Sequence, residues 1–307
     1  MPLLGTDPAL GWWGSKKGSR DLFARCGVPH PAGSDLMRDL YGLAEATATL
    51  WESQPDLARC VVKLNEGFSG EGNAPLELAP LALDELSAPE RRKRLREALE
   101  TLPMPALSWR QRVEEQGALV EAWLEGGEDL SSPSVQGFIH PGGAVEVLST
   151  HEQILGGPSG QTYLGCRFPA DGAYRQVLME HGLRVGQALA AEGALERFGV
   201  DFIARSIAGH WDLQAIEVNL RQGGTTHPYM ALCALTTGRL DPASGRFLTP
   251  TGEALHYQAT DNLCDERLRG LLPVDLIDIV AEAGLHYDPA RLRGSVFHLL
   301  GCLSEFG

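Results

Sequence analysis

The sequence lacks closely spaced cysteines, long apolar runs and an excess of positive charge. Its six cysteines stand at positions 26, 60, 166, 233, 264 and 302, and no two of them form a CxxC pair. This spacing excludes a zinc ribbon and a compact disulfide framework, and it favours a reduced, cytoplasmic setting. No apolar run approaches the roughly 18 to 20 residues of a membrane span. At the N-terminus the basic residues follow a short apolar stretch, which is the reverse of a signal peptide.

Positive charge is scarce, because 26 Lys and Arg residues face 40 Asp and Glu residues and give a net charge of −14. A chain this acidic repels phosphate backbones, so we expect neither nucleic acid nor a membrane as its partner. The hydrophobic content of 43% and the charged content of 21% are those of an ordinary globular protein. Its 307 residues suggest about two domains of about 150 residues each.

Hydrophobic periodicity and turn residues predict a mixed α/β chain. Helices are expected over 19–25 (closed at Gly27), 35–52, 173–197 and 228–235, with a helix-rich, highly charged region over 75–117. Strands are expected over 58–64, 118–124, 134–139, 144–149, 161–168, 199–205 and 210–219, before a small α/β tail over 254–307. The glycine-rich segment 149–168 is long enough to act as a lid in which His151, Gln153 and Gln161 read a substrate, although a purely structural loop fits equally well.

The predicted hairpin at 199–219 carries the most informative polar residues. A turn centred near Gly209 would place Asp201 opposite Glu217, and Asn219 would share the face of Glu217 because strand side chains alternate. Two carboxylates and an amide oxygen on one face are hard ligands that suit Mg²⁺. The alternative is the ordinary polar face of an exposed hairpin.

Two further segments are typical of nucleotide contacts. Lys63 ends a strand and is followed by the glycine-rich turn 67–72, whose backbone N–H groups could approach phosphates. The apolar run 119–124 leads into acidic residues, so backbone groups there could hold adenine and a carboxylate could hold ribose. A plain loop and a plain strand with a turn are the respective alternatives.

Taken in chain order, these segments resemble the ATP-grasp superfamily of carboxylate–amine ligases. The resemblance implies an α/β (α+β) fold in which two subdomains clamp ATP, followed by a small C-terminal domain. It assigns the nucleotide to Arg20 (where the family usually offers a lysine), Lys63, the mobile loop residues Gly67, Ser69, Gly70 and Gly72, the adenine-binding Glu121, Trp123 and Leu124, and the ribose-binding Glu128. It assigns Mg²⁺ to Asp201, Glu217 and Asn219.

A narrower resemblance is to the peptide ligases of the pheganomycin type. It rests on VVKLNEGFSGEGNA, SPSVQGFIHPGG, LSTHEQILGGPSGQTYLGCRFPAD and EVNLRQGGTTHP, with FHLLGCLSEFG similar to the family's C-terminal domain. It implies a small ATP-grasp subdomain over 16–124, a large one over 125–245 and a C-terminal domain over 246–307 that we expect to be truncated. The α/β subdomain that usually precedes the first lysine motif is expected to be absent.

The family chemistry implies that ATP phosphorylates a substrate carboxylate and that an amine then attacks the acyl phosphate, with ATP and Mg²⁺ as cofactors. The position two residues before Asp201, where the superfamily often has a catalytic arginine, holds Gly199. Arg221 and Arg167 are therefore the candidate catalytic cations, and His227 is the candidate on the acceptor side, with a packed structural histidine as its alternative. The expected partners are small-molecule or peptide carboxylates and amines, and a homo-oligomer is compatible with the sequence. The alternative function is a non-catalytic Mg-ATP-binding module or an inactive fragment.

Overall fold

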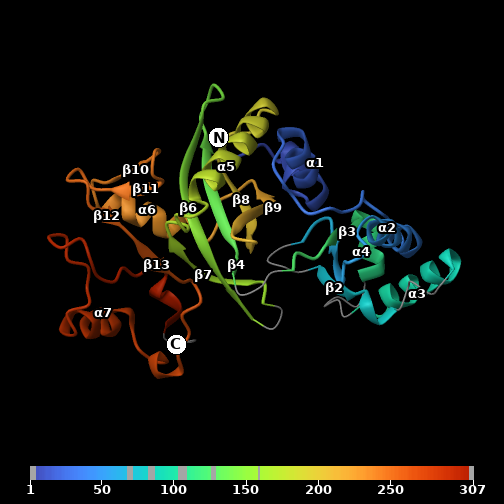
Figure 1. Ribbon diagram of the computed structural model, residues 1–307. Helices are drawn as coiled ribbons and strands as arrows, with labels where there is room; N and C mark the ends of the chain where they lie inside the picture. Colours follow the sequence, from blue (N-terminus) through green and yellow to red (C-terminus); the bar gives the residue numbers. More distant parts are fainter. Residues whose placement is uncertain are drawn as a thin grey trace.

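The computed structural model describes residues 5–67, 72–81, 87–102, 109–125, 129–157 and 160–303 (Figure 1). Its α-helices are α1 (Lys16–Cys26), α2 (Leu40–Ser53), α3 (Ala88–Glu100), α4 (Trp109–Gln116), α5 (Arg175–Ala191), α6 (Thr226–Leu235) and α7 (Pro273–Glu282). Its strands are β1 (Arg59–Leu64), β2 (Asn73–Glu77), β3 (Ala118–Ala122), β4 (Leu130–Ser131), β5 (Pro133–Ile139), β6 (Val145–Gly156), β7 (Thr162–Phe168), β8 (Glu196–Ile207), β9 (His210–Asn219), β10 (Arg239–Asp241), β11 (Arg246–Leu248), β12 (Ala254–Leu255) and β13 (Tyr257–Ala259). Within these ranges the model has no helix that is long and apolar enough to cross a membrane.

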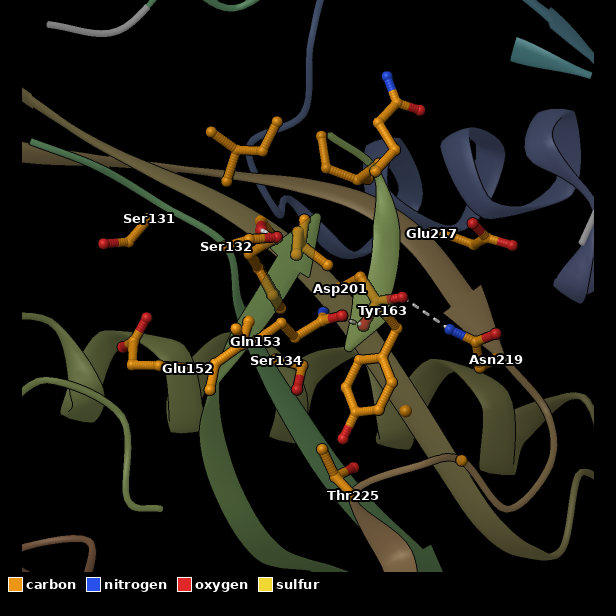
Figure 2. Close-up of a pocket in the computed structure, with 18 of the residues that line it drawn as sticks. Ser131, Ser132, Ser134, Glu152, Gln153, Tyr163, Asp201, Glu217, Asn219 and Thr225 are labelled. Atoms are coloured by element: carbon orange, nitrogen blue, oxygen red, sulfur yellow. Dashed lines mark hydrogen bonds between the residues drawn. The ribbon is translucent and has the colours of Figure 1, made fainter. Parts of the chain in front are cut away.

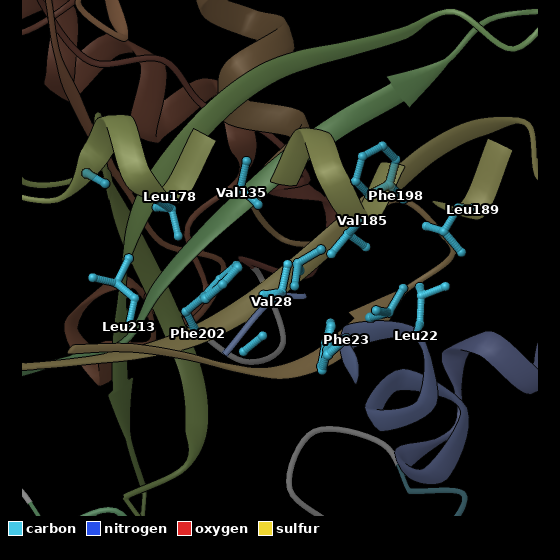
Figure 3. Packing of buried hydrophobic residues seen from close by; sticks show 14 of the residues in the cluster. Leu22, Phe23, Val28, Val135, Leu178, Val185, Leu189, Phe198, Phe202 and Leu213 are labelled. Carbon is cyan, nitrogen blue, oxygen red and sulfur yellow. The ribbon is translucent and has the colours of Figure 1, made fainter. Parts of the chain in front are cut away.

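The larger sheet has the strand order β13-β7-β6-β5-β8-β4, and β9 pairs with β8. One face of this sheet packs against α5 and α1 (Figures 1 and 3). Alternate β8 side chains (Phe198, Val200, Phe202 and Ala204) are buried in that core, so the residues between them face the other way. Gly186 lets α5 lie close to the sheet, because a Cβ there would stand 2.6 Å from Phe198 Cζ.

Helix α1 is well capped, because Ser15 accepts a hydrogen bond from the Gly18 N–H and Gly27 closes the helix at φ 65°. The predicted closure at Gly27 is thereby confirmed. Its Leu22 and Phe23 are fully buried in the core of the larger sheet. Helix α1 therefore packs with the larger sheet, although the predicted division at residue 124 grouped it with the smaller one.

The smaller sheet, in the order β2-β1-β3, packs with α2, α3 and α4 around a second apolar core (Figure 1). The region 75–117 is helix-rich as predicted, but its first residues lie in β2, where Ala74 and Leu76 turn inward at the strand period. The helix predicted from residue 35 begins at Leu40, because Gly33 and Met37 form backbone bridges with β3 instead.

The chain after α5 adds a third, smaller core. Phe168, Tyr229, Phe247 and Leu255 form it, where α6 and the β10-β11-β12 sheet cover part of β7. Within the predicted C-terminal domain over 246–307, β13 pairs with β7 as the edge strand of the larger sheet. The predicted lid over 149–168 is mostly regular strand, since β6 extends to Gly156 and β7 begins at Thr162. The predicted helix 173–197 ends at Ala191, and Glu196 already starts β8.

Candidate functional site

A cavity of about 1120 Å³ lies between the two sheets. Its lining comes from β1, β2 and β3 on one side and from β5, β6, β7, β8 and β9 on the other. The wall also includes residues of β4 and of the connection after β3, residues of the loop after β9, and Asp261 and Asn262. Figure 2 shows that polar side chains from several strands converge on this space.

On the smaller sheet, Lys63 and Glu121 stand on the neighbouring strands β1 and β3, and both are buried. Lys63 Nζ forms an ion pair with Glu121 Oε2, and the Arg20 guanidinium contacts Glu121 Oε1 at 2.9 Å. Burial opposes ionisation of Glu121, but the charges of Lys63 and Arg20 outweigh it and hold the pKa of this carboxyl below its usual value. The structure thus brings together three of the residues that were assigned to the nucleotide. Lys63 and Glu121 line the cavity, whereas Arg20 supports Glu121 from behind and also donates to the Pro31 carbonyl at 2.8 Å.

On the larger sheet, the β8–β9 hairpin turns at Ala208 and Gly209, which both have positive φ angles. That turn sets Phe202 opposite Ala215, and a β-bulge then leaves Ile216 without a direct partner. Beyond the bulge Asp201 lies opposite Glu217, so the predicted pairing is confirmed. The predicted turn centre at Gly209 was slightly displaced, and the bulge compensates for that displacement.

Asp201 is surrounded by polar groups. Its two carboxylate oxygens accept hydrogen bonds from Gln153 Nε2 at 2.8 Å and from Asn219 Nδ2 at 2.9 Å (Figure 2). Burial and then the charge of Glu217 raise the pKa of Asp201 to about 6, against the opposing effect of Asn219, Lys16 and Gln153. Lys16, which the sequence analysis did not single out, forms a 2.5 Å ion pair with Glu217. Its contact joins the start of α1 to β9 across the fold, so no local pattern in the sequence indicated it.

The donor set at this position fits a hard divalent cation. Asp201 and Glu217 are opposed carboxylates whose mutual repulsion a cation would relieve, and the Asn219 amide has an oxygen to offer if it rotates. Across the described ranges no group of three His, Cys, Asp or Glu side chains is placed to hold a metal, so a cation at this position would rely on the two carboxylates together with oxygen from Asn219 or water. The assignment of Mg²⁺ to Asp201, Glu217 and Asn219 stays a prediction.

The other predicted nucleotide residues fall into two groups. Trp123 and Leu124 line the cavity just after β3, and the Trp123 ring lies 4.9 Å from the Arg59 guanidinium carbon. Gly67 and Gly72 stand on either side of a stretch that the structure does not describe. Ser69, Gly70 and Glu128 lie outside the described residues, so their predicted roles are untested.

The three predicted catalytic residues are dispersed. Arg221 is exposed and lines the cavity after β9. Arg167 also lines the cavity, and in the β6–β7 register it lies opposite Glu152. The next pair in that register is Cys166 with Gln153, and the Gln153 side chain donates a hydrogen bond to Asp201. Arg167 is therefore on the opposite face of the sheet from the Gln153–Asp201 contact. His227 lies in the first turn of α6, outside the cavity lining that the structure describes, with its ring centroid 4.1 Å from that of His298. Their catalytic roles stay predictions, and the geometry favours Arg221 among them.

Tyr163 is a cavity residue that the sequence analysis missed. Its ring lies against the loop after β9, because a Cβ on Gly224 would stand 2.6 Å from Tyr163 Cε1. Figure 2 shows the phenol directed toward Thr225, next to Asp201. The useful signal would have been the pair of glycines at 223 and 224, which leaves room for a large side chain.

Some known proteins are similar to this chain in sequence, and others are similar to it in fold. The family model of the PGM1 C-terminal domain matches residues 275–307. The chain is 33% identical over 304 residues to the L-propargylglycine–L-glutamate ligase of Streptantibioticus cattleyicolor, which covers 96% of this chain and 58% of the ligase. Biotin carboxylase from Campylobacter jejuni, solved as a β-γ-ATP complex, matches with a TM-score of 0.56 at 18% identity, over 74% of this chain and 45% of that one. The chain thus has an ATP-grasp-like fold and is similar in sequence to an amino-acid ligase.

The match to the PGM1 C-terminal domain agrees with the similarity to the pheganomycin-type ligases that the sequence motifs indicated. The biotin carboxylase domain of the Hydrogenobacter thermophilus 2-oxoglutarate carboxylase, solved with MgADP, has the same fold, with a TM-score of 0.54 at 18% identity over 73% of this chain and 43% of that one. IQ motif-containing protein H of Danio rerio is 25% identical over 335 residues, 97% of this chain and 31% of that protein. The chain spans 58% and 31% of the lengths of these two curated relatives.

Proposed function

We propose that this chain is an ATP-grasp ligase that binds Mg-ATP in the cavity and uses it to join a carboxylate to an amine. The main support for this proposal is that one cavity is lined by polar residues of both sheets. They are Lys63 and Glu121 on the smaller sheet and Asp201 and Glu217 on the larger sheet. A nucleoside triphosphate needs cationic and hydrogen-bonding groups that hold its phosphates, and it needs oxygen ligands for the bound metal. The relationship to an amino-acid ligase supports the same reaction class.

In the proposed reaction, a substrate carboxylate oxygen bonds to the γ-phosphorus of ATP while the bond from that phosphorus to the bridging oxygen breaks, which releases ADP. The amine nitrogen then bonds to the acyl carbon, the carbon–oxygen bond to phosphate breaks, and the nitrogen gives up a proton. Magnesium, when bound, neutralises charge on the transferring phosphoryl group.

The chain's own residues position the reactants in this scheme. Lys63 holds phosphate oxygens, and the backbone around Trp123 and Leu124 holds the adenine, since these residues line the cavity next to Glu121. Arg221, exposed on the cavity wall two residues after Asn219, supplies a positive charge for the phosphoryl group. Such positioning and charge complementarity account for most of the catalysis of phosphoryl transfer.

The test is a hydroxamate assay, because hydroxylamine traps an acyl phosphate whatever the natural amine is. The purified chain is incubated with ATP, MgCl₂, hydroxylamine and single carboxylates, beginning with L-propargylglycine and L-glutamate, and hydroxamate and ADP are measured. We expect both products to appear together and to disappear when EDTA removes the metal. Binding of Mg-ATP by calorimetry with neither product from any carboxylate would identify the non-catalytic nucleotide-binding module instead.

A further inference from the structure

Two residues from the C-terminal region reach the cavity. Asp261 and Asn262 follow β13 directly and line the cavity beside the strands of the larger sheet. The sequence motifs gave this region no part in the site. Its contribution matters because Asp261 places a carboxylate on the side of the cavity formed by β7, whereas Asp201 and Glu217 lie on β8 and β9.

The position of Asp261 is fixed by its neighbours. Strand β13 pairs with β7, and the contact continues beyond β13, where Thr260 Oγ1 donates to the Leu164 carbonyl at 2.6 Å and Asn262 Nδ2 donates to the Tyr163 carbonyl at 3.1 Å. Gly165 permits this close approach, because a Cβ there would stand 2.2 Å from the Ala259 carbonyl oxygen. The segment 257–262 is thus held against β7 on both sides of Asp261.

Asp261 is exposed on the cavity wall, and its carboxylate forms no ion pair with the described residues. Its Oδ1 accepts a hydrogen bond from Asn262 Nδ2 at 2.9 Å, and within the described ranges no Lys, Arg or His side chain forms an ion pair with it. In the same cavity Lys63 forms an ion pair with Glu121, and Glu217 forms one with Lys16. A carboxylate that lines a binding cavity without a cationic partner is suited to a cationic ligand.

Tyr163 lines the same cavity as Asp261 and Asp201 and carries a hydroxyl that can donate a hydrogen bond. Both carboxylates act on its phenol, which is also packed against Gly224. Burial is the main cause that raises the pKa of Tyr163, so the phenol remains protonated. Its hydroxyl hydrogen-bonds with Cys166, and rotation of the hydroxyl would let it donate to an anionic ligand group instead. A hydrogen-bond donor in the same cavity as an unpaired carboxylate complements the carboxylate and the ammonium group of an amino acid.

We propose that Asp261 binds the ammonium group of the amino acid whose carboxylate is activated, with that carboxylate directed toward Tyr163. The proposal rests on the function proposed above and narrows it to an α-amino acid as the carboxylate substrate. An amine held in an ion pair keeps its proton and has no lone pair for attack. The same contact therefore stops the activated amino acid from acting as its own acceptor.

The experiment compares amino acids with the same acids lacking the amine. Hydroxamate formation and calorimetric binding to the chain loaded with Mg-ADP are measured for L-propargylglycine against pent-4-ynoate, L-glutamate against glutarate and L-alanine against propanoate. The variants are Asp261→Asn and the matched control Asp278→Asn, which removes one carboxylate from α7 away from the cavity lining. We expect the wild type and the control to prefer the amino form, and Asp261→Asn to lose that preference by at least about tenfold, mainly through KM.

The outcomes separate this proposal from the proposed function. An unchanged preference in Asp261→Asn overturns the role of Asp261 even when hydroxamate forms normally. An equal loss for both members of each pair also overturns it, because a merely structural residue would act on both. A wild type that makes hydroxamate from the desamino acids as well as from the amino acids supports the ligase chemistry and overturns this inference alone. Absence of hydroxamate from all six acids overturns the ligase function, and the binding measurement then decides on Asp261.

Discussion

Glu121 is the residue at which the two sheets are joined by charge. Lys63 reaches it from β1 of the smaller sheet, and Arg20 reaches it from α1, which packs with the core of the larger sheet. All three side chains are buried, so removal of one cation leaves the carboxylate with a single partner in a low-dielectric surrounding. The same contacts hold Lys63 at the cavity wall, where a nucleotide phosphate would find it already oriented.

Lys63→Ala should weaken Mg-ATP binding by roughly 10- to 150-fold, because a hydrogen bond to a charged group contributes roughly 1.5 to 3 kcal/mol. Lys63→Arg keeps the charge and should retain most of the affinity. Isothermal titration calorimetry on both variants and the wild type gives the answer. Equal affinity in wild type and Lys63→Ala would remove Lys63 from the nucleotide site.

Glu217→Gln should lower magnesium-dependent ATP turnover by at least about 100-fold, in the range found for the loss of one electrostatic group at a reacting phosphoryl or acyl centre. Its amide keeps the shape but not the charge that faces Asp201. We expect only a small loss of stability, of about 1 kcal/mol, since Gln can still accept a hydrogen bond from Lys16. The matched control is Asp212→Asn on the same strand, which pairs with Arg205 outside the cavity lining. Wild-type turnover in Glu217→Gln would contradict the metal assignment.

At the scale of elements, the β8–β9 hairpin shows what sequence reasoning could and could not reach. Alternation and a glycine-containing turn were enough to predict that Asp201 faces Glu217, and the structure has that pairing. The bulge at Ile216 was not predictable, because its residue type is ordinary for a strand and the insertion appears only in the register. The predicted pairing was correct because the displaced turn centre and the bulge shift the register in opposite directions.

The same limit applies to segments whose structure depends on distant partners. The glycines of 149–168 suggested a flexible lid, yet Gly165 is there to admit the backbone of β13, nearly a hundred residues later in the chain. Asp261 and Tyr163 were missed for the same reason, since the residues beside them in the cavity come from distant parts of the chain. Capping and local periodicity, by contrast, placed α1, β1 and α6 to within a few residues.

Gly165→Ala should loosen the segment 257–262, because the added methyl group would stand 2.2 Å from the Ala259 carbonyl and the residue has a φ of 151°. We expect a loss of about 1 to 3 kcal/mol in unfolding free energy, as for an overpacked site. Amide hydrogen exchange should accelerate in β13 and its neighbours first. Gly11→Ala, where nothing lies within 4 Å, is the control that should change neither. Unchanged protection of β13 would show that the close approach is not needed.

At the scale of the whole molecule, three apolar cores are linked by a few buried polar contacts. The core formed by α6 and β10–β12 is connected to β6 through His151, whose Nε2 lies 2.7 Å from the Tyr257 hydroxyl. The two rings also pack on Phe168, with Tyr257 stacked at 5.0 Å. His151 was predicted to read substrate, but it is fully buried in this contact and does not line the cavity.

Stability should therefore depend on pH through His151. Burial lowers its pKa to about 3, whereas the unfolded chain takes up the proton near the ordinary value of 6.5. Between these values only the unfolded state is protonated, so the stabilisation is complete above pH 6.5 and falls by up to about 1.4 kcal/mol for each unit below it. The variant His151→Gln keeps a hydrogen-bonding group for Tyr257 but has no titrating group. In urea unfolding at pH 7 and pH 5, its unfolding free energy should fall between the two pH values by about 2 kcal/mol less than that of the wild type. The exposed His210→Gln should follow the wild type, and identical pH dependence in His151→Gln and the wild type would mean that His151 is not held neutral in the fold.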